Sequence, residues 1–181
     1  MLFNHTSDEL LRLCGHTLDL AKQSGATAAE ADFSESLGQS VSVRLGEIEQ
    51  IEFQQDKSLD ITVYVGQRKG RASTADFSER ALQDTVKAAI DIARYTAEDD
   101  CAGLADAALM ATHIGDLDRY HEWDLSTESA IDLAKQCEQA ALSTDKRIEN
   151  SEGASVHTGH YQYVYGNTHG FAAHQQSTHH S

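Results

Sequence analysis

The fold is decided by the stretch Leu59-Asp60-Ile61-Thr62-Val63-Tyr64-Val65-Gly66-Gln67-Arg68-Lys69-Gly70-Arg71-Ala72-Ser73-Thr74. Apolar residues occupy every second position from 59 to 65, and a period of two is typical of a strand with one buried face. The glycine-bounded loop Gly66–Gly70 follows, and a short strand is predicted from Arg71 to Thr74. Because connections this short join antiparallel strands, the stretch predicts part of a meander.

The same period of two extends toward the N-terminus. Apolar and polar residues alternate over 29–33 and again over 41–45, which predicts two separate strands with a turn at Gly46-Glu47. The apolar residues from 48 to 53 do not keep one parity, so we expect a bulge near Glu49-Gln50. A further turn is predicted at Asp56-Lys57-Ser58, and the meander as a whole spans residues 28–74.

Strands are predicted again after Asp145. Three apolar residues surround a Ser151-Glu152-Gly153 turn and read as strand positions: Ile148, Ala154 and Val156. Three tyrosines share one parity and are expected to pack as a stripe over the sheet: Tyr161, Tyr163 and Tyr165. The segment Gly166–Gly170 predicts a hairpin turn, and the return strand begins at Phe171. These strands together span 147–181.

Three helices are predicted between and before the strands. Thr6 and Glu9 have the spacing of a capping box, and they precede a helix over 7–24 with an apolar stripe at helical spacing. Asp76 is the expected cap of a second helix that ends near Tyr95. The third helix is predicted from Thr127 to Leu142, with four small or apolar residues facing inward: Ile131, Ala134, Cys137 and Ala141.

The order of these elements predicts an α+β fold. We expect a largely antiparallel mixed sheet with about three helices packed on one face. Residues 1–181 are interpreted as a single N-terminal domain: helix 7–24, meander 28–74, helices within 76–142 and strands 147–181. The sequence ends without a turn or a cap, which indicates that the natural chain is longer.

Charge and cysteine content limit the classes of function. The chain has 14 basic and 29 acidic side chains, a formal charge of −15. This charge argues against a nucleic-acid-binding protein, which needs a basic face. No apolar run is long enough to span a membrane. The three cysteines are far apart without a C-x-x-C pair, which is typical of a reducing compartment. A cytoplasmic location is therefore expected.

Histidine patterns give two candidate metal sites, and neither is complete. His121-Glu122 begins like the zinc motif H-E-x-x-H, but no second histidine follows and the segment reads as a surface loop. Six histidines lie in the last 25 residues: His157, His160, His169, His174, His179 and His180. His157 and His160 face opposite ways on a continuous strand, so we expect adventitious metal affinity rather than a catalytic site. No catalytic, cofactor or metal residue is predicted.

Positive charge is concentrated in one place, at Arg68, Lys69 and Arg71. A cradle for an anion is conceivable there, but the glycine spacing differs from that of nucleotide-binding loops, and a strand follows instead of a helix. A solvated hairpin tip is the favoured interpretation. A charged tip of this kind can still contact a partner protein.

Four ordered segments resemble the PmbA/TldD family: 43–52, 61–78, 96–106 and 147–154. The last three are similar to its PmbA (TldE) branch, although Tyr120-His121-Glu122-Trp123 departs from the Y-H-P-W of that branch. The resemblance implies a cytoplasmic protein that pairs with a homologous TldD-type subunit in a zinc-dependent peptidase. An older description of the family is modulator of DNA gyrase. In the TldD branch, a C-terminal H-E-x-x-x-H helix supplies the zinc ligands, and these 181 residues lack that motif.

The expected function is therefore a scaffold and substrate-cavity domain of a PmbA-type subunit that acts on unfolded peptides. No cofactor is expected in this chain, because the resemblance places zinc in the TldD-type partner. Six charged residues are the candidate contacts with that partner or the substrate: Arg44, Glu47, Glu52, Arg68, Lys69 and Arg71. The alternative is a non-enzymatic regulator that binds DNA gyrase or another protein, and self-association is also left open.

Overall fold

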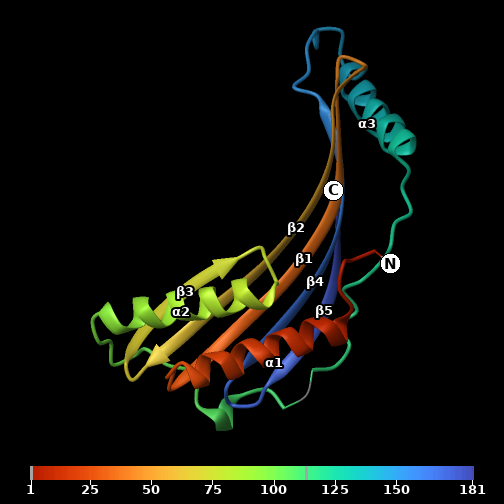
Figure 1. Ribbon diagram of the computed structural model, residues 1–181. Coiled ribbons are helices and arrows are strands. Elements are labelled where there is room, and N and C mark those ends of the chain that lie inside the picture. The colour runs from red at the N-terminus through yellow and green to blue at the C-terminus, as the bar shows by residue number, and fades with distance from the viewer. Residues whose placement is uncertain (1, 113) are drawn as a thin grey trace. The chain divides into compact units, whose positions relative to one another are not determined.

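The computed structural model describes residues 2–112 and 114–181 and confirms the α+β class (Figure 1). Within these residues, five strands form one antiparallel sheet in the order β3-β2-β1-β4-β5, accompanied by three α-helices. The strands are β1 Ala28–Arg44, β2 Glu47–Val65, β3 Arg68–Thr74, β4 Ala154–Asn167 and β5 Ala172–His180. The helices are α1 Ser7–Gln23, α2 Glu79–Tyr95 and α3 Thr127–Leu142, with a 3₁₀ turn η1 at Ala107–Leu109. None of these described helices is long and apolar enough to cross a membrane.

The chain divides into two compact units that share the long strands. Unit 1 comprises Met1–Glu35, Asp56–Leu117 and Gln162–Gln175, apart from the two residues outside the description. Unit 2 comprises Ser36–Gln55, Asp118–Tyr161 and Gln176–Ser181. Each unit has a hydrophobic core of its own.

The core of unit 1 lies between the sheet and the helices α1 and α2. The alternating residues of β1 and β2 supply its sheet side, as predicted: Ala29, Ala31, Phe33, Leu59, Ile61 and Val63. The helix side comes from stripes at helical spacing on α1 and α2: Leu10, Cys14, Leu18, Ala21, Leu82, Val86, Ala89, Ile90 and Ala93. The apolar stripe predicted on the first helix is thereby confirmed.

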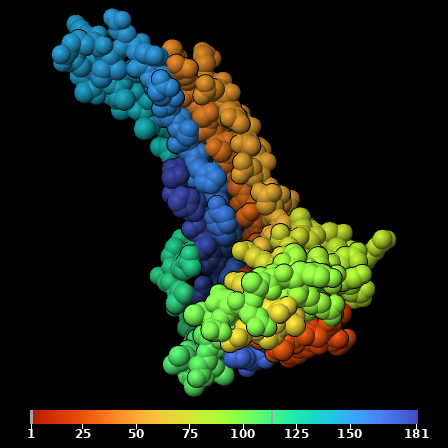
Figure 2. All heavy atoms as spheres, turned by 90° about the vertical axis from the view of Figure 1, so that its left-hand side faces the viewer, coloured from red at the N-terminus to blue at the C-terminus, as the bar shows by residue number. Residues whose placement is uncertain are grey.

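Helix α2 lies directly on the hairpin made by β2 and β3 (Figure 2). Val65 pairs with Arg68 across a two-residue turn, and Leu59 pairs with Thr74 at the other end of the ladder. A Cβ atom on Gly70 would lie 2.0 Å from the carbonyl oxygen of Ala89. Only glycine therefore permits this distance between helix and strand.

Unit 2 has a smaller core, in which α3 packs on β1 and β4. Its buried residues are Val41, Val43, Ala130, Ala134 and Val156. Gly38 of β1 lies close to β4, because a Cβ atom there would be 3.0 Å from the carbonyl oxygen of Thr158. This glycine marks a close approach between two backbones rather than a turn.

Several boundaries differ from the sequence predictions. β1 is one strand and not two, and β2 runs without a turn through Asp56–Ser58. Pairing within the sheet thus overrides local turn preference. The hairpin turn is Leu45-Gly46, with β2 starting at Glu47, and β4 starts at Ala154, which leaves Ile148 outside any strand.

The predicted N-terminal cap is confirmed for α1 and is wrong for α2. Thr6 caps α1 with the full capping box, and Gly25 follows that helix with a φ of 99°, as expected of a C-terminal stop. Ser78 caps α2, so the prediction of Asp76 was wrong. Asp76 instead accepts a hydrogen bond from the Ser78 amide at 2.8 Å, which turns the chain into the cap.

Candidate functional site

The six predicted contact residues fall into two groups, one in each unit. Arg44 ends β1, while Glu47 and Glu52 lie in the first part of β2, and all three are exposed residues of unit 2. The Arg44 Nε donates to the carbonyl oxygen of Ser151 at 3.1 Å, which ties the end of the hairpin to the segment before β4. Arg44 therefore has a structural partner, and the two glutamates face solvent.

The cationic group lies on β3 in unit 1. Arg68 forms an ion pair with Glu98 at 3.2 Å and donates to the carbonyl oxygen of Arg94. Arg71 pairs with Asp60 at 2.8 Å. Lys69 is exposed on the same strand. Because two of the three cations are matched by carboxylates of their own unit, this hairpin offers little net charge to an anion.

The tip of the β1–β2 hairpin is held by a buried carboxylate that the sequence prediction missed. Glu138 of α3 accepts hydrogen bonds from the amides of Leu45 at 2.7 Å and Gly46 at 2.8 Å. Its side chain is buried, with the residue only 3% exposed. The Gly46 amide is the largest of the influences that lower the pKa of Glu138, with the Leu45 amide adding to it.

Helix α3 is rotated relative to the prediction. Its inward residues are Ala130, Ala134 and Glu138, whereas Cys137 and Ala141, which were expected inside, are exposed. Positions 130, 134 and 138 are spaced by four, which is compatible with one inward face of a helix. Glu138 did not suggest a buried position, however, because a glutamate is almost never fully buried unless it is paired. The pairing amides belong to a turn more than 90 positions away.

Large apolar side chains are exposed along the same hairpin. Leu45 is 54% exposed and Phe53 is 70% exposed, and Ile48 and Ile51 are also exposed. In the described sheet β3 pairs with β2 only from Leu59 to Val65, so the outer edge of β2 before Leu59 has no strand partner. A strand edge of this kind presents free backbone donors and acceptors.

A cluster of carboxylates and tyrosines lies in the sheet of unit 1. Glu30 accepts from the hydroxyls of Tyr64 and Tyr165, both at 3.0 Å, and Asp32 accepts from Tyr163. Burial is the largest cause of the raised pKa of Asp32, and it also raises the pKa of Tyr64 to about 12. These hydroxyls therefore stay protonated and donate to β1 across the physiological range.

A second polar cluster holds the N-terminal segment. The buried Glu35 accepts from the ring of His5 and from Gln162 Nε2, the latter at 2.8 Å. The Gln162 amide also donates to the carbonyl oxygen of His5, and His174 lies 3.3 Å from its Oε1. Burial lowers the pKa of His174. The polar atoms are matched to one another, which indicates a structural role.

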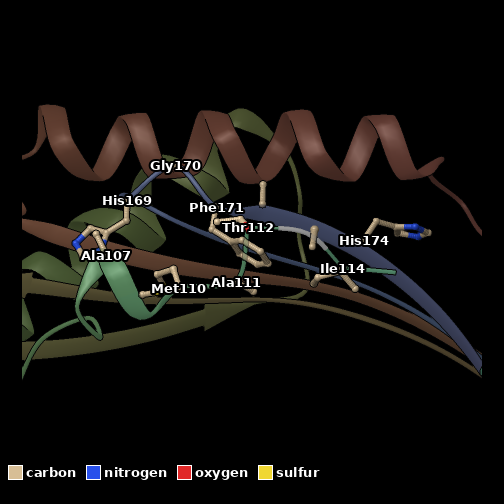
Figure 3. A pocket seen from close by; sticks show the side chains of 11 residues that line it. Ala107, Met110, Ala111, Thr112, Ile114, His169, Gly170, Phe171 and His174 are labelled. Atoms are coloured by element: carbon tan, nitrogen blue, oxygen red, sulfur yellow. The ribbon is translucent and has the colours of Figure 1, made fainter. Parts of the chain in front are cut away.

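Unit 1 also contains a cavity of about 560 Å³ beside the turn between β4 and β5 (Figure 3). His169, Phe171 and His174 line it from the turn and β5, while Met110 and Ile114 line it from the segment after η1. Its lining combines apolar side chains with exposed polar atoms, including imidazoles at two points. No motif in the sequence indicates this cavity, because its two walls come from segments about 60 residues apart.

The described residues contain no group of three or more side chains suited to holding a metal ion. The prediction of a loop at His121-Glu122 is confirmed, since neither residue is in a helix. The tail histidines meet only in pairs, with ring centroids 6.1 Å apart for His157 and His179 and 6.5 Å apart for His160 and His180. Two imidazoles are fewer than the three protein ligands of a catalytic zinc site.

Two family models match the sequence. The model for PmbA/TldA metallopeptidase domain 1 matches residues 29–93, and the model for the PmbA/TldA metallopeptidase central domain matches residues 120–181. The chain is 48% identical over 169 residues to the Metalloprotease PmbA homolog of Haemophilus influenzae, covering 93% of this chain and 37% of that protein. It is 50% identical over 153 residues to Metalloprotease PmbA of Escherichia coli O157:H7, covering 84% of this chain and 34% of that protein. The chain thus spans little more than a third of these relatives.

Solved structures share the fold. A Bacteroides thetaiotaomicron protein, described as a proposed modulator of DNA gyrase, superposes with a TM-score of 0.87 at 27% identity, over 96% of this chain and 40% of that one. TldE from Thermococcus kodakarensis superposes with a TM-score of 0.66 at 14% identity, over 92% of this chain and 37% of that one. At that identity the second match concerns the fold alone.

Proposed function

The chain belongs to the PmbA/TldD family, in its PmbA branch, and from this premise we propose that it is the N-terminal scaffold of a PmbA-type subunit. That subunit would belong to a zinc-dependent cytoplasmic peptidase that acts on unfolded peptides. A homologous TldD-type subunit would be its partner and would carry the zinc. The described side chains of this chain do not fit a zinc site, so no step of the reaction is assigned to them.

The unpaired outer edge of β2 is the observation that carries this proposal. An extended polypeptide can add to such an edge through main-chain hydrogen bonds, which depend little on sequence. This property suits a protein that receives unfolded segments. Glu47 and Glu52 lie along this edge, so they remain candidate contacts together with the cationic β3 residues.

Charge reversal tests the proposal in the assembled peptidase. Lys69→Glu and Glu52→Lys alter exposed residues, whereas Arg68, Arg71 and Arg44 have structural partners whose loss would confuse the result. We expect both variants to weaken either assembly with the TldD-type subunit or peptide turnover by the complex. Lys87→Glu, at an exposed position of α2, is the matched control. Assembly and turnover at the level of the control would remove these contacts from the proposal.

The alternative function is regulation of DNA gyrase by direct binding. It is favoured by one observation, the description of the Bacteroides thetaiotaomicron relative as a proposed modulator of that enzyme. Capture of purified gyrase subunits by the immobilised chain, with the TldD-type subunit as the parallel sample, separates the two functions. Capture of gyrase alone would favour regulation.

A further inference from the structure

The hydrogen bonds between β4 and β5 show which main-chain groups of β5 point outward. His157 and Ser181 exchange both of their main-chain hydrogen bonds, at 2.8 Å and 3.0 Å, so they are a hydrogen-bonded pair of the antiparallel ladder. Asn167 donates to the carbonyl oxygen of Phe171 in the same register at the other end. The odd-numbered residues of β5 therefore bond to β4, and the even-numbered residues direct their N–H and C=O groups away from it.

This outward edge opens on the cavity beside the β4–β5 turn. Ala172 and His174 are even-numbered residues of β5, and both line the cavity. β5 is the last strand of the described sheet, so no strand of that sheet lies beyond them. Met110 and Ile114, from the segment after η1, line the cavity as well (Figure 3). All of the described lining belongs to unit 1. The cavity therefore combines free main-chain groups with apolar side chains.

Further along, the same strand edge already binds a segment of this chain. The amide of Thr178, another even-numbered residue, donates to the carbonyl oxygen of Arg119 at 3.0 Å. The amide of His121 donates to the Thr178 hydroxyl at 3.0 Å. The segment that contains Arg119 and His121 is neither helix nor strand, and these contacts lie within unit 2. The β5 edge thus accepts irregular polypeptide through main-chain hydrogen bonds.

Charge limits what the cavity can hold. Among the described residues that line it, none is Asp, Glu, Lys or Arg, although 24% of the chain is charged. Figure 3 shows the imidazoles of His169 and His174 at opposite ends of the cavity, with Phe171 between them. Burial lowers the pKa of His174, which keeps this imidazole uncharged at neutral pH. A charged occupant would leave water without a counter-charge in this lining, so an uncharged one fits better.

We propose that this cavity, here called the β5 groove, binds an extended, uncharged segment of an unfolded polypeptide from another molecule. The segment adds to the edge at Ala172 and His174 through main-chain hydrogen bonds, and its apolar side chains contact Met110, Ile114 and Phe171. The inference goes beyond the proposed function, which places peptide binding at β2. It assigns a second binding site, and this site needs neither zinc nor the partner subunit.

The size of the β5 groove favours a single polypeptide segment over a second copy of this chain. Its volume of about 560 Å³ lies in the range that holds a ligand of drug size. A short extended stretch of chain is of this size, whereas a strand edge of a second copy arrives with a whole sheet behind it. The segment after η1 lies beside β5 and stands in the way of such a sheet.

Ala172→Pro tests the main-chain hydrogen bond. Proline has no N–H, and on an edge strand with its N–H turned outward it leaves the bonds to β4 in place. Gln176→Pro is the matched control, because Gln176 is also an even-numbered residue of β5 but does not line the groove. The probe is the blocked pentapeptide acetyl-Ser-Val-Thr-Val-Ser-amide, followed by calorimetric titration. We expect a Kd about three- to tenfold weaker for Ala172→Pro and unchanged for Gln176→Pro.

Ile114→Asp tests the apolar wall. This substitution places a carboxylate in the groove at a side chain that is 37% exposed, so folding should be retained. Leu109→Asp is the matched control, because Leu109 is 81% exposed in η1 and does not line the groove. Ile114→Asp should weaken binding at least about tenfold and Leu109→Asp should not weaken it. Circular dichroism melting of all four variants shows that each is folded, and the wall variant decides the test if Ala172→Pro is not.

Three results would overturn the β5 groove. The first is failure of the unchanged chain to bind the pentapeptide. The second is binding by Ala172→Pro and Ile114→Asp as tight as that of their controls. The third is sedimentation of the chain as a dimer that Ile114→Asp dissociates, which would identify a second copy as the occupant. None of them bears on assembly with the TldD-type subunit or on turnover by the complex, so the proposed function fails or stands separately.

Discussion

Gly70→Ala should weaken unit 1 by forcing α2 away from the β2–β3 hairpin. The new Cβ atom would lie 2.0 Å from the carbonyl oxygen of Ala89 and 2.6 Å from the amide nitrogen of Ala93. Both are backbone atoms, so no side-chain rotation relieves the contact. The first distance is about 1.4 Å short of the 3.4 Å at which ordinary contact begins, and the helix or the strand must move by a comparable amount.

This displacement acts on the core of unit 1. Leu82, Val86, Ala89, Ile90 and Ala93 of α2 are all buried against the sheet and cannot follow the helix without opening gaps. Overpacking of this kind costs roughly 1–3 kcal/mol, and backbone contacts favour the upper end. For a chain of this length, about 3 kcal/mol corresponds to a fall in Tm of roughly 6–12 °C.

Thermal unfolding followed by far-ultraviolet circular dichroism measures this effect, with two glycine controls. Gly115→Ala adds a Cβ atom in open space at ordinary φ and should leave Tm unchanged. Gly66→Ala also has open space but a φ of 62°, so it should cost about 1 kcal/mol through backbone strain alone. The close-approach argument fails if Gly70→Ala melts within error of Gly66→Ala.

Three further outcomes follow from the pKa shifts. Burial raises the pKa of Cys14 to about 12, so iodoacetamide at pH 8 should label only Cys101 and Cys137, with mass spectrometry showing two additions on the native chain and three after unfolding. The pKa of Glu138 is lowered in the folded state, so its stabilisation is complete above its ordinary value of 4.5 and is lost as pH falls through the lower folded value. Glu138→Gln should therefore reduce Tm at pH 7, with the deficit narrowing in acid. The pKa of His174 lies below its ordinary 6.5, so its contribution is present above pH 6.5 and declines in acid. His174→Gln should flatten the loss of Tm between pH 7 and pH 5, and an unchanged slope would contradict this.

Local patterns predicted the elements whose determinants are local. The capping box at Thr6, the stripe on α1 and the alternation of 59–65 depend on residues within a few positions of one another, and the structure confirms each. β2 was divided wrongly because Asp56–Ser58 has turn chemistry. Its backbone stays extended within the sheet, and such pairing involves residues that are distant in sequence.

The candidate site was less accessible to sequence analysis. Charged residues drew attention to Arg68 and Arg71, yet their charges are matched by Glu98 and Asp60 from other elements. The unpaired outer edge of β2 depends on where β3 ends, at the pairing of Leu59 with Thr74, and neither residue reveals that limit by its type. The cavity beside the β4–β5 turn likewise requires the fold.

Leu45 shows how a local inconsistency can be informative once the turn is known. A hairpin with the loop Leu45-Gly46 keeps the glycine that its turn type favours and replaces the preferred asparagine by a leucine. Sequence analysis placed the turn one residue later, at Gly46-Glu47, because Leu45 continues the apolar alternation of Val41 and Val43. Deviation from local preference is expected where function requires it. The turn with the strained leucine, whose φ is 50°, persists because the Glu138 carboxylate of α3 accepts hydrogen bonds from both of its amides, a long-range contact that the local sequence does not reveal.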